Sequence, residues 1–250
     1  MKKAGLILLF TLVTIFSFAQ QKTYIGLDFS GSNDLYKITD SGTELTNPPL
    51  KNNQFAITVR QDINKYLSIE TGLMRKHLVR GLIFTPLVGS GGEWYGGRSN
   101  IIPLKLITRI NIRKEKIYLV PTIGINYYMC GHQGGSSYGG YQKEEGGDSV
   151  HSQFTTTSGL HANYFLLQLG LSSEFLIWKK FIFSIFVNRY IGFERILTTN
   201  INYTVNKNPQ IYTASEYTKG DFWNLGIGIK YPLQWKIYHD NSKRILQKTD

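Results

Sequence analysis

The sequence contains little cysteine and, after its first residues, no long apolar run. One cysteine among 250 residues excludes a disulfide framework. A structural zinc site is not indicated either, because no Cys-x-x-Cys or Cys/His pair stands at ligand spacing. No apolar run approaches the roughly 20 residues of a membrane-spanning helix. Disorder is also excluded, because 14% of the residues are aromatic and disordered chains are poor in such residues.

The N-terminus has the order of an export signal. Lys2 and Lys3 precede an apolar run at residues 4–16, and a small-x-small cleavage pattern ends at Ala19. The apolar run is too short for an uncleaved membrane anchor. We therefore predict a cleaved signal peptide at residues 1–19, which accounts for two positive charges of the net +11.

The remaining chain has a period of two, which is typical of strands with two unlike faces. In the clearest case Trp223, Leu225 and Ile227 alternate with Asn224 and Gly226. Eight segments show the pattern, near residues 25–30, 55–60, 67–73, 102–112, 117–128, 165–174, 183–188 and 223–231.

The connections between these segments alternate between short and long. Short ones lie at residues 64–65, 113–116 and 178–180, and long polar ones at residues 31–52, 79–99, 129–163 and 192–221. An up-and-down antiparallel barrel places alternate connections at opposite rims. The predicted fold is therefore an all-β, eight-stranded antiparallel up-and-down barrel over residues 20–232, followed by a basic periplasmic tail at residues 233–250.

The charged residues decide which face of this barrel is inside. They fall on the polar face, at Asp28, Arg60, Glu70, Lys105, Arg109, Glu174 and Lys230. An eight-stranded interior is only wide enough to be filled by side chains, so it cannot hold all the Leu, Ile, Phe and Trp of the other face. We therefore predict a transmembrane barrel with its apolar face toward the lipid of an outer membrane. A soluble barrel or sandwich remains the alternative.

Aromatic residues near both ends of the strands predict two interfacial belts. The set near the short turns is Tyr66, Tyr118, Trp178 and Tyr231, and the set near the long loops is Tyr127, Tyr128, Tyr164 and Trp223.

Two short motifs resemble the PorT-like outer-membrane β-barrel family. They are Ile-Ile-Pro-Leu-Lys-Leu at residues 101–106 and Tyr-Leu-Val-Pro-Thr-Ile-Gly at residues 118–124, and Phe-Ala-Gln at residues 18–20, around the predicted cleavage site, is also similar. The resemblance implies an eight-stranded outer-membrane barrel, in a family with one member involved in protein secretion. The chain departs from many outer-membrane barrels by continuing past Pro232, so the final aromatic residue of the last strand is Tyr231 or Trp235.

The candidates for chemistry are weak. The inward charges fit an ion-selective path or a structural plug, and we favour the plug. The loop at residues 129–163 holds potential metal ligands, at Cys130, His132, Glu144, Glu145, Asp148, His151 and His161, but in no metal-binding spacing. No metal, cofactor or catalytic residue is predicted.

The predicted function is that of a non-enzymatic membrane scaffold whose loops or tail bind a protein or a surface ligand. Its predicted partner is the lipid bilayer. A second candidate partner is another envelope protein, which the sequence does not identify. Nucleic acid is not expected, because the basic residues form no single patch with aromatics. The alternatives are a component of a secretion or gliding apparatus, which the resemblance implies, and a rim enzyme acting on lipid A or peptides, for which His77 and His161 are candidates.

Overall fold

A computed structural model describes the protein over most of its length. The described residues are 22–43, 45–46, 50–84, 92–113, 116–130, 135–145, 148–160, 163–177, 181–204 and 210–233. The predicted signal peptide and nearly all of the predicted tail lie outside these ranges. Among the described residues, no helix is long and apolar enough to span a membrane.

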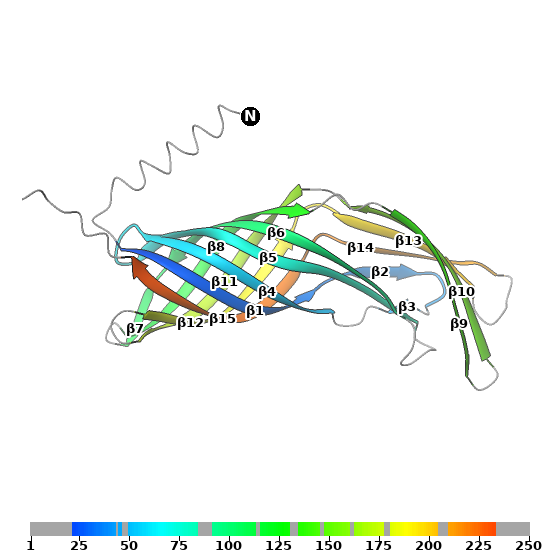
Figure 1. Ribbon diagram of the computed structural model, residues 1–250, viewed down its shortest axis with the longest axis horizontal. Helices are drawn as coiled ribbons and strands as arrows, with labels where there is room; N and C mark the ends of the chain where they lie inside the picture. Colours follow the sequence, from blue (N-terminus) through cyan, green and yellow to red (C-terminus); the bar gives the residue numbers. More distant parts are fainter. Residues whose placement is uncertain are drawn as a thin grey trace, which may run out of the picture.

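The described chain consists of β-strands (Figure 1). Their bounds are β1 Thr23–Asp34, β2 Lys37–Asp40, β3 Leu45–Thr46, β4 Leu50–Asp62, β5 Leu67–Phe84, β6 Gly92–Thr108, β7 Ile110–Arg113, β8 Ile117–Cys130, β9 Gly135–Glu145, β10 Asp148–Leu160, β11 Asn163–Ile177, β12 Phe181–Gly192, β13 Leu197–Tyr203, β14 Tyr212–Thr218 and β15 Phe222–Leu233.

Eight of these strands form a closed antiparallel barrel. The order is β1, β4, β5, β6 with its continuation β7, β8, β11, β12 and β15, and β15 pairs with β1 to complete the ring. The eight strands coincide with the eight segments of alternating sequence, so the predicted fold is confirmed. Closure leaves none of these strands with an unpaired edge, as a backbone inside a bilayer requires.

The barrel wall is apolar outside and polar inside. On β6, Leu104 is 59% exposed and points outward, whereas the neighbouring Lys105 points into the barrel and pairs with Glu70. On β1, Leu27 is exposed and Asp28 is buried. This is the inverse of a soluble barrel and matches a lipid-facing surface.

The short connection between β4 and β5 is a tight turn at one rim. Between β4 and β5, the Asn64 side-chain oxygen accepts hydrogen bonds from the backbone N–H groups of Tyr66 and Leu67, each at 2.8 Å. Asn favours such turns because its side chain can replace a backbone acceptor. The turn at residues 178–180 lies outside the described residues.

The long connections differ from their prediction as polar loops. Three of them contribute strands to a second, five-stranded sheet in the order β2, β14, β13, β10, β9, which extends from the barrel end opposite the tight turns (Figure 1). In the fourth, β5 and β6 continue as a paired ribbon as far as Ile83 opposite Gly92. Strands β13 and β14 alternate buried and more exposed residues, but their Thr, Asn and Ser content made this alternation resemble loop sequence. We call β2, β9, β10, β13 and β14 the distal sheet.

Candidate functional site in the barrel lumen

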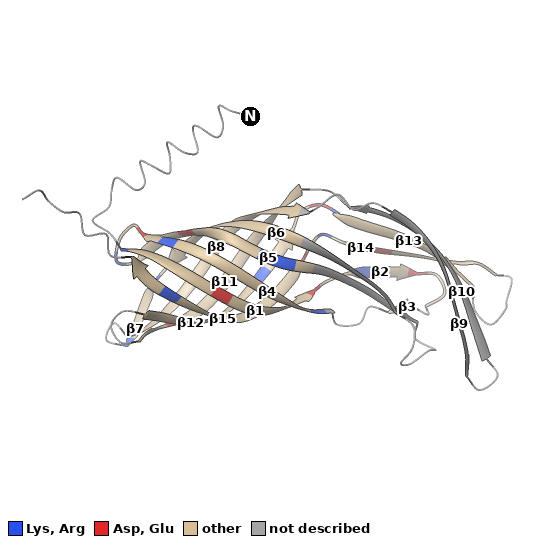
Figure 2. Cartoon of the chain, viewed as in Figure 1, with Lys and Arg blue, Asp and Glu red and all other residues tan. Residues whose placement is uncertain are grey.

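The structure places all seven predicted charged residues on the inner side of the barrel wall. Figure 2 shows basic and acidic positions on the barrel strands between the two rims. Five of them, Arg60, Glu70, Glu174, Lys230 and Asp28, are less than one-tenth exposed. Charges buried to this degree need partners, because an unpaired charge away from water is costly.

A first cluster lies toward the tight turns and is centred on Glu174 of β11. Its carboxylate accepts from Arg60 Nη1 at 2.5 Å and from Arg109 Nε at 3.3 Å. Asp62 completes the cluster, with Oδ2 at 3.1 Å from Arg109 Nη1. The guanidinium of Arg109 also lies over the ring of Tyr24, 5.5 Å from its centroid. Asp62 was not among the predicted charges, although its position two residues after Arg60 places it on the same face.

A second cluster is centred on Glu70 of β5. Its two carboxylate oxygens each lie 2.8 Å from a lysine Nζ, one from Lys105 of β6 and one from Lys230 of β15. Asp28 is buried nearby on β1, and its Oδ1 accepts no hydrogen bond from the described residues. We call the two clusters together the ionic layer, which comprises Asp28, Arg60, Asp62, Glu70, Lys105, Arg109, Glu174 and Lys230.

Above the ionic layer, side-chain amides form a hydrogen-bonded chain across four strands. Gln168 donates to Asn188 at 3.0 Å, Asn188 donates to Asn224 at 2.8 Å, and Asn224 donates to Gln54 at 3.0 Å. We call these four residues the amide chain. None was singled out from the sequence, although each has the parity of an inward-facing position.

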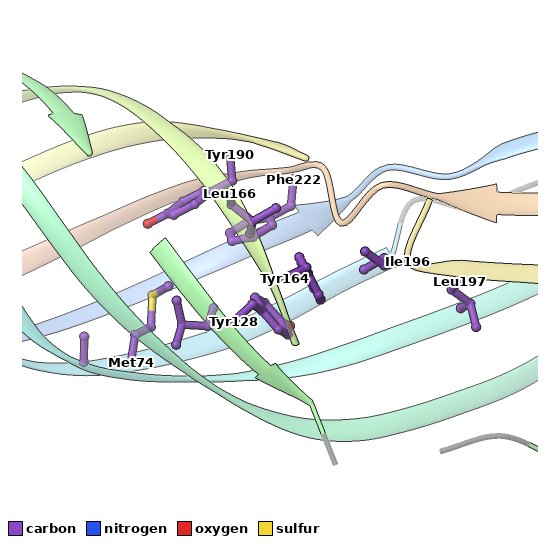
Figure 3. Packing of buried hydrophobic residues seen from close by; sticks show 10 residues of the cluster. Met74, Tyr128, Tyr164, Leu166, Tyr190, Ile196, Leu197 and Phe222 are labelled. Atoms are coloured by element: carbon purple, nitrogen blue, oxygen red, sulfur yellow. The ribbon is translucent and has the colours of Figure 1, made fainter. Parts of the chain in front are cut away.

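Toward the distal sheet the lumen is filled mainly by apolar and aromatic side chains (Figure 3). Tyr128 and Tyr164 stack with ring centroids 4.5 Å apart, and Tyr190 and Phe222 stack at 4.0 Å. Leu166 is fully buried among them. We call this cluster the outer seal; it comprises Met74, Ile101, Tyr128, Tyr164, Leu166, Tyr190 and Phe222. A buried ion pair, Lys76 Nζ to Asp34 Oδ1 at 2.5 Å, lies against it, with Lys76 over the Phe222 ring.

This packing corrects the predicted aromatic belts. Tyr128 and Tyr164 are only 1% and 9% exposed, so their assignment to the interface is wrong. Tyr118 lines a cavity at the tight-turn rim and is also misassigned. Adjacent strand residues point to opposite faces, so Tyr127 and Tyr128 could not both face the lipid.

The other belt residues differ in position. Tyr66 and Tyr231 near the tight turns, and Trp223 near the other rim, are exposed outward. Tyr127 is half-buried and packs on Phe165, with ring centroids 5.2 Å apart. Trp178 lies outside the described residues.

The described residues enclose three cavities along the lumen. One of about 530 Å³ opens at the tight-turn rim, where Lys22, Tyr24, Arg109, Tyr118 and Glu174 contribute to its lining. We call it the vestibule. Two smaller cavities, of about 40 and 20 Å³, lie inside the barrel.

The residues considered for catalysis or metal binding give no assembled site in the described part of the chain. No three His, Cys, Asp or Glu side chains gather there in a metal-binding arrangement. His77 is exposed at the end of the barrel nearer the distal sheet. The side chains of the loop candidates fall outside what the structure describes, at Cys130, His132, Glu144, Glu145, Asp148, His151 and His161.

Comparisons with known proteins give remote likenesses only. No family model matches the chain, and no curated protein is similar to it in sequence. Among solved structures, neisserial surface protein A is 10% identical, with 84% of this chain and 96% of that chain covered and a TM-score of 0.43. Outer membrane protein OprG from Pseudomonas aeruginosa is 12% identical, with 84% and 96% covered and a TM-score of 0.46. A major outer membrane protein from Thermus thermophilus is 12% identical, with 84% and 99% covered and a TM-score of 0.42.

The class of the protein follows from its own geometry. A closed eight-stranded barrel with an apolar exterior and charged residues inside satisfies its backbone and its surface only in a lipid bilayer. Short turns at one rim and long connections at the other are the arrangement of outer-membrane barrels, with the turns on the periplasmic side. The protein is an integral outer-membrane β-barrel protein.

Proposed function

We propose that the protein is a non-enzymatic outer-membrane scaffold that presents the distal sheet outside the cell for binding a protein or a surface ligand. The observation that carries this proposal is the order of the distal sheet. Three separate connections of the barrel meet in one sheet, which costs far more conformational entropy than leaving them as independent loops. An ordered outer platform is a suitable support for binding residues.

The described side chains of the distal sheet, on β2, β13 and β14, leave one face polar and accessible. On β13 and β14 its exposed members include Asn200, Asn202 and Thr213, with Ser215 and Tyr217 half-buried beside them. Arg195 lies over the Tyr217 ring at 4.1 Å and adds a charge to this face. The opposite face is buried, and Ile201 and Tyr203 are almost inaccessible there. We propose the polar face as the binding surface.

We also propose roles for the two ends of the chain and for the side chains that fill the lumen. Residues 1–19 are proposed as the cleaved export signal and residues 233–250 as a periplasmic tail. The ionic layer, amide chain and outer seal are proposed to plug the barrel, so that it does not conduct ions in a steady state. Membership of the PorT-like family, and with it a place in a secretion or gliding apparatus, remains a prediction from two short motifs.

Site-specific photocrosslinking in intact outer membranes tests the binding surface. A photoreactive residue at Asn200 or Asn202 should give one discrete adduct, and Thr213→Arg, which places a bulky charge beside Asn202 on the same face, should abolish it. The control is Lys65 in the periplasmic turn, where no adduct is expected. An adduct from Lys65 alone would contradict the proposal and favour a periplasmic partner, as a secretion component would have.

A further inference from the structure

The three cavities of the lumen form a row that begins at the periplasmic rim. Glu174 lines both the vestibule and the 40 Å³ cavity. Asp28, Lys105 and Asn188 line both the 40 Å³ cavity and the 20 Å³ cavity. Neighbouring cavities therefore share lining residues of the ionic layer, and the two inner cavities also share Asn188 of the amide chain.

These cavities have the size and lining that water requires. A buried water needs roughly 10–15 Å³ and two to four polar partners, and apolar cavities stay dry. The 40 Å³ cavity is lined by charged and amide groups, among them Glu70, Lys230 and Gln168. The 20 Å³ cavity retains Asp28, Gln54 and Asn224 but also reaches Met74 and Tyr190, which belong to the outer seal.

The row of cavities ends at the outer seal, where the side chains are mainly apolar and closely packed. Ile101, Leu166, Tyr128 and Phe222 are at most 1% exposed, and the rings stack within 4.5 Å of each other in pairs. Aliphatic and aromatic surfaces packed in this way offer water few partners.

We propose that the lumen is a water-filled half-channel, open to the periplasm as far as Asn188 and Asn224 and closed toward the cell exterior by the outer seal. This goes beyond the proposed scaffold function, because it assigns the barrier to permeation to one layer of the plug. Every member of the ionic layer except Arg60 lines one of these cavities, so the layer is wetted there and does not itself hold the barrel shut.

The charges of the ionic layer, which is the narrow part of the half-channel inside the vestibule, predict the selectivity of an opened form. The ionic layer holds four bases and four acids, so its formal charge is balanced. A pore lined by a balanced set attracts neither sign of ion strongly. Once the outer seal is removed, cations and anions should both pass.

Single-channel recording in planar bilayers, with the full-length processed protein, tests the position of the barrier. The double substitution Tyr128→Ala and Tyr164→Ala removes one stacked ring pair and should produce long-lived openings of weak ion selectivity. The matched control is Tyr127→Ala with Phe165→Ala. These residues are the sequence neighbours of the first pair and also form a ring contact between β8 and β11, but Phe165 faces the lipid at 56% exposure. The control should stay as silent as wild type.

A variant of the ionic layer tests whether the barrier to ions lies there instead of in the outer seal. Glu174→Gln removes the shared partner of Arg60 and Arg109 but leaves the outer seal intact, so it should not conduct steadily. Folding of every variant is checked by circular dichroism and heat-modifiable migration in gels. Openings in Glu174→Gln with silence in a folded Tyr128/Tyr164 variant would overturn the proposal, and so would silence in both.

Water-edited solid-state NMR on the wild-type protein in bilayers tests the same proposal without substitutions. Magnetisation from water should reach the side-chain amides of Asn188 and Asn224 rapidly and the methyl groups of Ile101 and Leu166 slowly. Equal rates at both sets would overturn the half-channel. Neither experiment involves the distal sheet. A failure of the half-channel proposal can therefore be distinguished from a failure of the proposed binding function, which the photocrosslinking tests.

Discussion

The two halves of the lumen are filled by different means. The periplasmic half is held by ion pairs, in which each acid at a cluster centre contacts two bases. The outer half is held mainly by stacked rings and aliphatic side chains, with the Lys76–Asp34 pair as the ionic contact described within it. The amide chain marks the boundary between them.

The difference indicates that the stability of the periplasmic half depends on the pairing of charges and that of the outer half on the packed volume. The central ion pair requires its particular partners, because Arg60 is fully buried and lines none of the three cavities, so water cannot replace Glu174 beside it. Packed rings and aliphatic groups tolerate changes that conserve volume and shape. We therefore expect the periplasmic half to respond to loss of charge and the outer half to respond to loss of volume.

The largest effect is expected for Glu174→Gln. The substitution keeps the shape of the side chain but deprives the fully buried Arg60 of its anion, which by analogy with other buried pairs costs about 3–5 kcal/mol. Equilibrium urea unfolding in lipid vesicles measures the loss. Asp62→Asn is the matched control, and its loss should be smaller because Arg109 keeps Glu174 as a partner. Equal losses in both variants would contradict the central role of Glu174.

In the outer half the expected effect of Leu166→Ala comes next. Leu166 is fully buried in the outer seal, and removal of a buried Leu side chain costs about 2–5 kcal/mol, depending on the cavity that remains. Leu169→Ala, three residues further along β11, is the comparison. Leu169 faces outward, where lipid fills the space left by the side chain, so its loss should be clearly smaller. A greater loss for Leu169→Ala in the same unfolding assay would refute the assignment of faces.

A third test addresses the close packing of the lumen wall. A Cβ atom at Gly72 would lie 2.1 Å from the backbone oxygen of Ile57, whereas one at Gly31 would have its nearest neighbour at 3.9 Å. Gly72→Ala should therefore cost about 1–3 kcal/mol, because the adjacent backbone must shift. Gly31→Ala should be nearly neutral in the same assay. If the two variants were equally stable, β4 and β5 would not approach as closely as the structure shows.

The sequence predicted the faces of the strands but not which side chains meet across the lumen. Alternation alone placed Arg60 and Glu174 inside. Their contact could not be read from it, because they are 114 positions apart and the stagger of the strands decides which levels coincide. Glu70, which stands opposite Arg60 in the β4–β5 ladder, instead contacts Lys105 and Lys230.

Two other features needed the structure for different reasons. Tyr128 and Tyr164 carried the correct signal, because each has the inward parity of Asn126 and Leu166, but the belt prediction weighed only their place near the strand ends. The distal sheet gave a weaker signal. Its strands are rich in Thr, Asn and Ser, residues also common in loops, and the pairings of β10 with β13 and of β14 with β2 join connections far apart in the chain.

The smallest effect is expected at the boundary between the halves, for Asn188→Ala. The substitution removes hydrogen bonds to Gln168 and Asn224, and a dry interior would lose about 1–3 kcal/mol for each amide left unpaired. Both inner cavities reach Asn188, so water can take over these bonds at little cost. We therefore expect a total loss of only about 1 kcal/mol in urea unfolding. Asn200→Ala on the exposed face of the distal sheet, with an expected change within about 0.5 kcal/mol, is the control. A loss at Asn188 as large as that of Glu174→Gln would mean that water does not reach the amide chain, and the boundary of the wetted half would lie nearer the periplasm.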